Sequence, residues 1–256
     1  MSDLGPGTTP GTAIVTGGAR RIGAALCRAL ARDGWHLLIH CRESEAEARA
    51  LAAELGNAKM VAADLAEPES ADTIMAALDG LPPPRLLVNN ASRFVHDSAD
   101  DFEIGQWDRN LAINLRAPAL LSRAFAARAG QGAVIVNLLD AKLAALNPDF
   151  FSYTISKIAL AGLTELHARA WAGRGIRVCA IAPSVVLVSG PQSRDNFERV
   201  HALNPLGRGV RVDELVSALR FIIATPTFTG QTIFLDGGQQ FLALKRDVQF
   251  LEEDDG

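Results

Sequence analysis

The sequence has little cysteine, a single tyrosine and no excess of charge of one sign. Its three cysteines lie far apart, at positions 27, 41 and 179, which argues against a disulfide framework and is typical of a reducing compartment. A formal net charge of -4 argues against nucleic acid or an acidic membrane as a partner. No spacing among the cysteines and the five histidines fits a zinc site, so we expect no metal.

Long apolar runs are also missing. No stretch of about 18 apolar residues lacks charges or chain breakers, so we expect no membrane span. The N-terminal MSDLGPGTTPGT is polar and has no apolar run of the kind that a signal peptide needs. With the sparse cysteines, these absences predict a cytoplasmic location. The chain, 256 residues with 48% hydrophobic side chains, is long enough to bury one full-sized core.

Short apolar runs alternate along the chain with helical stretches. We expect strands at 13–15, 35–41, 60–63, 86–88, 132–138, 177–182 and 232–235, and helices at 21–32, 45–55, 106–128, 152–172 and 212–224. Continuously apolar strands between helices predict a parallel sheet that is covered on both faces. The fold class is therefore α/β, a single-domain, Rossmann-like, doubly wound parallel sheet of about seven strands. Such folds bind ligands beyond the carboxyl ends of the strands.

A glycine-rich stretch joins the first expected strand to the first expected helix. It reads Thr16-Gly17-Gly18-Ala19-Arg20-Arg21-Ile22-Gly23. In this context glycines let the chain turn sharply and let a pyrophosphate approach the free N–H groups of the helix N-terminus. The spacing TGxxxGxG would place a glycine at position 21, and Arg21 stands there instead. Its guanidinium would add charge-assisted bonds to phosphate.

The second expected strand ends in His40-Cys41-Arg42-Glu43-Ser44. An NAD site offers the ribose hydroxyls a carboxylate at this place, whereas an NADP site offers an arginine. Arg42, with Arg21 nearby, favours the 2′-phosphate and therefore NADPH as the cofactor. Glu43 is the opposing observation, and we interpret it as a solvated residue before the helix.

Tyr153 and Lys157 lie four residues apart in an expected helix, so they share one face. A tyrosine ionises near pH 10, and a neighbouring ammonium and the positive nicotinamide ring would lower that pKa. Tyr153 could then exchange a proton near neutrality. The alternative is a surface tyrosine beside a solvated lysine.

Six motifs in this order resemble the short-chain dehydrogenase/reductase superfamily over nearly the whole chain. They are TGGARRIG, Asp64-Leu65, Asn89-Asn90-Ala91, Asn114, YTISK at 153–157, and Pro183. The resemblance implies that Asp64 and Leu65 flank adenine, and that Lys157 binds the nicotinamide ribose. It also implies that Asn114 holds a water in the proton relay. The expected cofactor-binding residues are Gly17, Arg20, Arg21, Ile22, Gly23, His40, Arg42, Asp64, Leu65, Asn90, Ala91, Ser92, Tyr153, Lys157 and Pro183.

The chain departs from that superfamily where the usual catalytic serine lies, 13 residues before the tyrosine, because Asp140 stands there. Arg21, the run Asn-Asn-Ala-Ser92-x-Phe94 and this aspartate together resemble the pteridine reductases of the superfamily. They also resemble its bacterial dihydromonapterin and dihydrofolate reductases. This resemblance implies that Phe94 stacks on the pterin and that Ser92 hydrogen-bonds pterin or phosphate. Arg21 would lie near both.

Reducing the C=N bond of a pterin needs a hydride at carbon and a proton at nitrogen. A carboxyl group at position 140 would accept from ring N–H and amino donors, or pass a proton through Tyr153, whereas a serine suits a ketone oxygen better. We therefore expect a pterin or folate substrate. The expected catalytic residues are Asp140, Tyr153, Lys157 and Asn114, and the expected substrate residues are Arg21, Ser92, Phe94, Asp140, Tyr153 and Leu187.

Two alternatives stay open. One is a short-chain carbonyl reductase, such as a 3-oxoacyl thioester reductase, and the other is a catalytically inactive NADP-binding protein. The resemblance further implies a homotetramer with the 152–172 helix in an interface. Along the chain we expect a disordered N-terminal tail at 1–11, the NADP-binding reductase domain at 12–242 and a C-terminal tail at 243–256. Residues 184–205 would form a substrate loop, a mobile lid with Ser-Gly-Pro-Gln breakers.

Overall fold

The structure, a computed structural model, describes residues 10–188 and 192–251. In these ranges seven parallel strands form one sheet in the order β3-β2-β1-β4-β5-β6-β7. The strands are β1 (Thr12–Val15), β2 (His36–Cys41), β3 (Ala58–Ala62), β4 (Pro84–Asn89), β5 (Val134–Leu138), β6 (Arg177–Pro183) and β7 (Thr232–Leu235). Val15 at the end of β1 pairs with Ile39 of β2 and Val88 of β4, so the strands end at one edge. This confirms the expected doubly wound α/β sheet.

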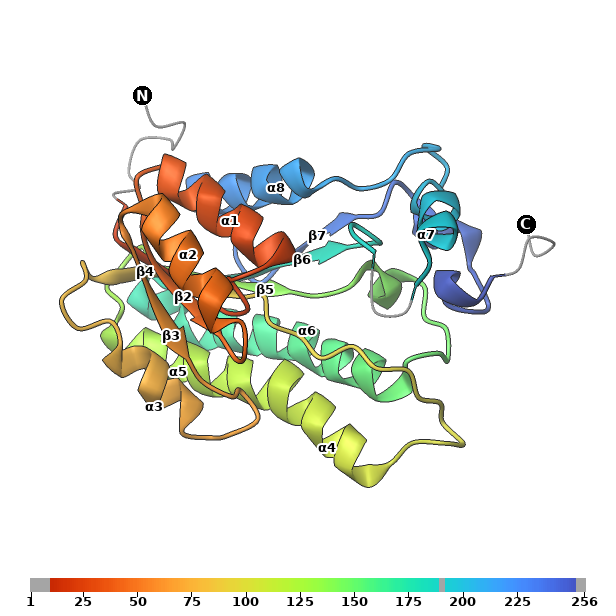
Figure 1. The fold of residues 1–256 in the computed structure, drawn as a ribbon, viewed down its shortest axis with the longest axis horizontal. Coiled ribbons are helices and arrows are strands. Elements are labelled where there is room, and N and C mark those ends of the chain that lie inside the picture. The colour runs from red at the N-terminus through yellow and green to blue at the C-terminus, as the bar shows by residue number, and fades with distance from the viewer. Residues whose placement is uncertain (1–9, 189–191, 252–256) are drawn as a thin grey trace.

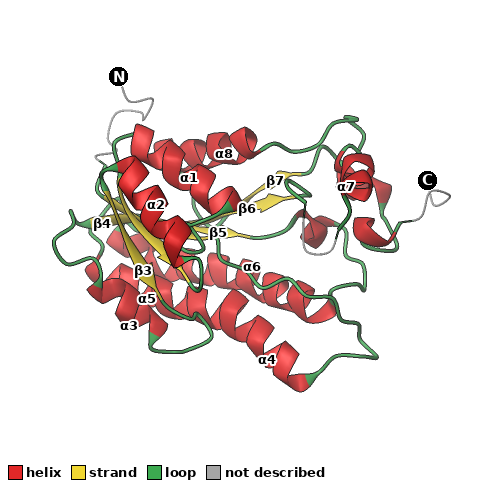
Figure 2. Cartoon of the chain, in the orientation of Figure 1, coloured by secondary structure: helices red, strands yellow, loops and turns green. Residues whose placement is uncertain are grey.

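Helices cover both faces of the sheet. They are α1 (Arg21–Arg32), α2 (Glu45–Leu55), α3 (Ser70–Ala76), α4 (Ile104–Leu111), α5 (Ala117–Arg128), α6 (Phe151–Trp171), α7 (Arg194–His201) and α8 (Val212–Ala224). In Figure 1, α1, α2 and α8 lie on one face, and α3, α4, α5 and α6 lie on the other. Figure 2 shows the strands between these two helical layers.

Two apolar cores flank the sheet, because neighbouring residues of a strand point to opposite faces. Along β1, Ala13 and Val15 join the core beneath α1, α2 and α8, whereas Ile14 joins the core beneath α3 and α5. A strand that is buried on both faces reads as continuously apolar, which is why the sequence reveals it so clearly.

The helix expected at 106–128 is interrupted. Between α4 and α5 the chain makes a π-helical turn, Ala112–Arg116, that contains Asn114. Pro118 follows and has no N–H to donate to the carbonyl of Asn114, four residues earlier. This missing donor is a physical reason for the altered backbone hydrogen-bond pattern of the helix. Turns of this kind are frequent at functional sites. The sequence pattern also does not anticipate α3, nor α7 inside the expected substrate loop.

The C-terminal segment at 243–251 was expected to be part of a tail, and it packs against α7. Val248 and Leu251 are buried with Val200, and a 3-10 turn spans Val248–Phe250. The N-terminal residues 1–9, the lid breakers at 189–191 and the acidic end at 252–256 lie outside the described residues. Among the described residues, no helix combines the length and the apolar character needed to cross a bilayer.

Candidate active site

A cavity of about 280 Å³ opens beyond the carboxyl ends of β1, β4, β5 and β6, where this fold is expected to bind ligands. Segments that follow these four strands supply much of its lining, and α6 and the C-terminal segment supply more. From the residues that the sequence singled out, it brings together Arg21, Ile22, Asn90, Ser92, Phe94, Asp140, Tyr153, Lys157, Pro183 and Leu187.

Tyr153 and Asp140 are joined by a hydrogen bond in this cavity. The Tyr153 hydroxyl donates to Asp140 Oδ2 at 2.7 Å. The other oxygen, Asp140 Oδ1, accepts from the Lys142 N–H at 2.8 Å and caps the 3-10 turn Ala141–Ala144. The turn after β5 therefore fixes the carboxylate, and the carboxylate fixes the phenol.

The surroundings raise the pKa of Tyr153 well above its usual value of 10, first through burial and then through the charge and hydrogen bond of Asp140. In this structure the ammonium of Lys157 does not lower the pKa of Tyr153, and the expected lowering with the nicotinamide ring of the bound cofactor stays a prediction. The ammonium has no such effect because Lys157 Nζ lies 5.6 Å from the centre of the phenol ring and donates to the Leu138 carbonyl at 2.7 Å. Burial in turn lowers the pKa of Lys157 to about 8, against the opposing effect of Asp140.

Asn114, in the π-helical turn, connects the segment after β4 to α6. Its Oδ1 accepts from the Arg93 N–H at 2.8 Å and from the Ser92 hydroxyl at 3.2 Å. Its Nδ2 donates to the Arg93 carbonyl at 2.9 Å and to the Ser156 hydroxyl at 3.0 Å. Asn114 lies outside the cavity lining and orders the segment that carries Ser92 and Phe94. Its role in a proton relay stays a prediction.

Phe94 presents an aromatic surface to the cavity. One face stacks on Phe150, with ring centres 4.0 Å apart and an interplanar angle of 17°. The ring of Tyr153 meets Phe94 edge to face at 4.7 Å. Phe94 is therefore held by two aromatic neighbours and offers a flat apolar contact beside the proton-donating phenol.

The phosphate loop has the shape that a pyrophosphate needs. A Cβ added at Gly23 would come within 2.1 Å of the Gly17 carbonyl, and Gly17 itself has a φ of +60°. The first turn of α1 has no side-chain cap, so its N–H groups point to the loop without a side-chain acceptor. This cradle fits the diphosphate of a dinucleotide.

Arg21 adopts a φ of +53°, in the left-handed region that favours glycine. This explains why the glycine-rich pattern has its usual glycine at that position. Arg21 Nη2 lies 3.5 Å from the Leu187 carbonyl, so the two expected substrate residues meet at the cavity. The strain of such a backbone tends to persist where a side chain has a function.

His40 supports the phosphate loop from inside the protein. Its Nδ1 accepts from the Gly17 N–H at 3.2 Å, and its Nε2 lies 3.0 Å from the Ala63 carbonyl. Burial lowers the pKa of His40, although the Ala63 carbonyl and the Asp64 charge work against it. The neutral ring therefore fixes Gly17 in place.

Of the two residues expected near the 2′-phosphate, Arg42 pairs with a carboxylate, whereas Arg21 lies beside the Leu187 carbonyl at the cavity. Arg42 lies 2.7 Å from Glu43, and both side chains are largely exposed. Arg20 pairs with Glu47 of α2. A 2′-phosphate would thus compete with Glu43 for the guanidinium of Arg42.

The other expected cofactor residues lie around the strand ends. Asp64 Oδ2 accepts from Arg109 at 2.9 Å, and Leu65 is buried. Asn90 Nδ2 donates to the Thr16 carbonyl at 2.8 Å, and the Ala91 N–H donates to the Thr16 hydroxyl at 3.0 Å. Outside the gaps in the described chain, no group of three or more His, Cys, Asp or Glu side chains is placed to hold a metal.

Sequence reasoning missed one wall of the cavity. The C-terminal part of the chain and the turn after Asp140 contribute Lys142, Asp236, Gln239, Gln240, Leu244, Asp247, Val248 and Gln249. All of them except Lys142 follow the last strand, in a polar stretch without helical or strand periodicity. The apolar residues Leu244 and Val248 were the available signal of burial in that stretch.

Comparison with known proteins agrees with this geometry. The model of the short chain dehydrogenase family matches residues 11–198. The chain belongs to the short chain dehydrogenase family. A solved structure of FolM alternative dihydrofolate reductase 1 from Brucella canis complexed with NADP is 40% identical, with a TM-score of 0.86, and the match covers 90% of this chain and 94% of that one.

Curated members of the short chain dehydrogenase family with other activities are also similar. Galactitol 2-dehydrogenase (L-tagatose-forming) from Cereibacter sphaeroides is 35% identical over 88% of this chain and 93% of its own length. The 3-oxoacyl-[acyl-carrier-protein] reductase of a Synechocystis strain is 28% identical over 90% of this chain and 97% of its own length. The family membership is therefore common to proteins that act on different substrates.

Proposed function

We propose that this short chain dehydrogenase family member is an NADPH-dependent reductase of a pteridine ring. The observation that carries the proposal is the Asp140–Tyr153 hydrogen bond of 2.7 Å in the cavity. A half-buried carboxylate at this place suits a substrate that offers N–H donors, because an unmatched carboxylate beside a ketone oxygen would repel it.

The residues present fit a dinucleotide. Gly17 and Gly23 leave room for the diphosphate, and Arg42 and the cavity-lining Lys157 would hold the 2′-phosphate and the nicotinamide ribose. When bound, NADPH supplies the hydride. The similar FolM structure is a complex with NADP, which supports the choice of cofactor.

Proton delivery falls to Tyr153. Its raised pKa keeps the phenol protonated at neutral pH, so it is an acid that holds its proton until a basic ring nitrogen accepts it. Asp140, which lines the cavity, orients the phenol and accepts hydrogen bonds from ring N–H or amino donors of the substrate. Phe94 packs against the flat face of the ring.

The alternative is a carbonyl reductase or polyol dehydrogenase. The similarity to galactitol 2-dehydrogenase and to a 3-oxoacyl-[acyl-carrier-protein] reductase supports it, as does the complete Tyr153–Lys157 pair. Against it stands Asp140 at the position of the serine that suits a ketone. We further propose a homotetramer that covers α6, where Ile158 is 42% and Leu166 is 65% exposed.

The test is NADPH oxidation by the purified protein with a panel of substrates. We expect turnover with a 7,8-dihydropterin and little with a 3-oxoacyl thioester or with the ketose formed from a polyol. A protein that reduces ketones well and ignores dihydropterins would contradict the proposal. If the protein binds NADPH but oxidises it with none of these substrates, it is a catalytically inactive NADP-binding protein.

A further inference from the structure

We propose that Asp247 and Lys142 form a recognition site for a hydroxylated side chain on the substrate. This inference rests on the proposed function and specifies the substrate class. The residues assigned to the ring are Asp140, Tyr153 and Phe94, and they leave this charged pair in the same cavity without a role.

The pair is buried and built into the cavity wall. Lys142 Nζ lies 3.4 Å from Asp247 Oδ2, with side-chain exposures of only 7% and 14%. Lys142 Nζ also donates to the Asp149 carbonyl, and Asp247 Oδ1 accepts from the Gln249 N–H at 3.1 Å. These partners offset the cost of keeping the two charges out of water. Because both residues also line the cavity, a polar ligand there would meet a donor and an acceptor that are already held in position.

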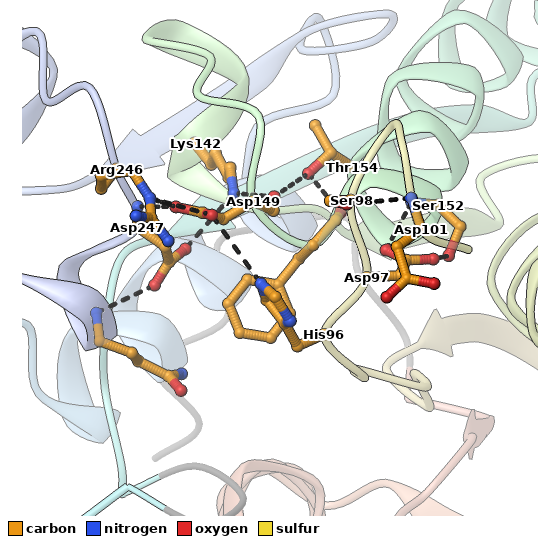
Figure 3. Close-up of polar contacts among 12 residues, drawn as sticks. His96, Asp97, Ser98, Asp101, Lys142, Asp149, Ser152, Thr154, Arg246 and Asp247 are labelled. Atoms are coloured by element: carbon orange, nitrogen blue, oxygen red, sulfur yellow. Dashed lines mark hydrogen bonds and ion pairs between the residues drawn. The ribbon is translucent and has the colours of Figure 1, made fainter.

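Asp149 holds the C-terminal segment so that Asp247 faces the cavity (Figure 3). Its Oδ2 accepts from Arg246 Nε at 2.8 Å and from the Asp247 N–H at 2.7 Å. Burial works to raise the pKa of Asp149, but these hydrogen bonds outweigh it and lower the pKa. The carboxylate therefore stays ionised and keeps the segment fixed. Asp149 lies next to the start of α6, the helix that carries Tyr153.

The charges in the cavity lining balance. The lining contains three basic side chains, Arg21, Lys142 and Lys157, and three acidic ones, Asp140, Asp236 and Asp247. An uncharged side chain therefore suits the cavity better than an anionic one. Apolar chains would leave the Lys142–Asp247 pair buried without a ligand partner.

A hydroxyl group can hydrogen-bond to both members of the pair, because it donates to a carboxylate and accepts from an ammonium. The amides of Gln240 and Gln249 line the same cavity, and Asn147 Oδ1 is buried there without a hydrogen-bond donor in the described part of the chain. A short alkyl chain with neighbouring hydroxyls would satisfy these groups. The bulky, anionic tail of dihydrofolate would not.

The experiment compares three substrates with the same ring: 6-methyl-7,8-dihydropterin, a 7,8-dihydropterin with a trihydroxypropyl side chain, and dihydrofolate. The unmodified protein should prefer the trihydroxypropyl substrate in kcat/KM. Asp247→Asn should lower kcat/KM for that substrate by about 10- to 150-fold, the range for one lost charge-assisted hydrogen bond. The loss for the methyl substrate should be much smaller. Lys142→Gln should shift the same ratio in the same direction.

Asp100→Asn, an equivalent change at an exposed loop position, is the matched control and should leave the ratio unchanged. Thermal melts check that each variant is folded. Equal losses on the methyl and trihydroxypropyl substrates, no loss on either, or a preference of the unmodified protein for dihydrofolate would each overturn the recognition site while the reductase function stands. No turnover of the methyl substrate by the unmodified protein would instead overturn the proposed function, and this site with it.

Discussion

The hydroxyl of Tyr153 donates a hydrogen bond of 2.7 Å to Asp140, which lies 13 residues earlier and caps the start of the 3-10 turn after β5. The phenol thus faces an anion, whereas the ammonium of Lys157 lies 5.6 Å from the ring centre. A buried phenol that donates to a carboxylate holds its proton firmly, because ionisation would place two negative charges side by side.

The first prediction concerns the titration of Tyr153. It is the only tyrosine, so the phenolate absorbance reports one group. In the protein without cofactor we expect no phenolate signal up to the pH at which the chain unfolds, because burial and Asp140 raise the pKa well above 10. Asp140→Asn should lower the midpoint, since it removes the charge. A midpoint below that of free tyrosine in the unmodified protein would contradict this environment.

The second prediction concerns turnover. Asp140→Asn keeps the shape of the side chain and removes its charge and its exchangeable proton. We expect kcat with a dihydropterin to fall by about 10²- to 10⁴-fold, the usual range for lost acid–base help. The Kd for NADPH should change by no more than a few fold. Asp100→Asn is the control at an exposed position. Full activity of Asp140→Asn would show that this carboxylate is not a substrate ligand.

Much of the fold follows from local pattern. The bounds of α1, α2, α8 and β7 agree with the expected ranges. The reason is that glycine and polar residues flank each of these strongly periodic or apolar runs. Asp140, Tyr153 and Lys157 meet because two of them share one face of α6 and the third lies two residues after the end of strand β5. Such contacts between successive elements are accessible from sequence.

Contacts made by a segment without periodicity could not be predicted from the sequence. Asp247 reaches the cavity because a carboxylate 98 residues earlier, Asp149, accepts from its N–H, and no local pattern encodes that distance along the chain. The pKa of Tyr153 was missed for a related reason. The sequence identifies Lys157 as its neighbour on the helix. Only the structure shows that Lys157 donates to the Leu138 carbonyl while the phenol donates to Asp140.

The third prediction concerns the cofactor. If Arg42 binds the 2′-phosphate, as we propose, the unmodified protein should bind NADPH more tightly than NADH. Arg42→Asp should weaken NADPH binding by about 10- to 150-fold and spare NADH. Glu43→Gln should strengthen NADPH binding modestly, because it releases the guanidinium from a partner 2.7 Å away. Fluorescence titrations of both cofactors measure this, and equal affinity for NADPH and NADH would contradict the assignment.

The fourth prediction links Lys157 to stability. Burial lowers its pKa from 10.5 to about 8, so between these values the unfolded chain binds more protons at this group than the folded protein does. The contribution of Lys157 to the free energy of unfolding must therefore rise with pH across that window, and below pH 8 the buried charge carries its full cost.

Lys157→Met removes this cost and should melt at a higher temperature than the parent protein at pH 7, while it loses most turnover. The stabilisation should shrink as the pH rises from about 8 towards 10.5, because the parent then folds with a neutral lysine. Comparing the two proteins at each pH cancels the opposite trend of Cys27 and Cys179, whose pKa values burial raises to about 12 and about 11. A stability difference that does not vary with pH in this window would show that Lys157 titrates as it does in the unfolded chain.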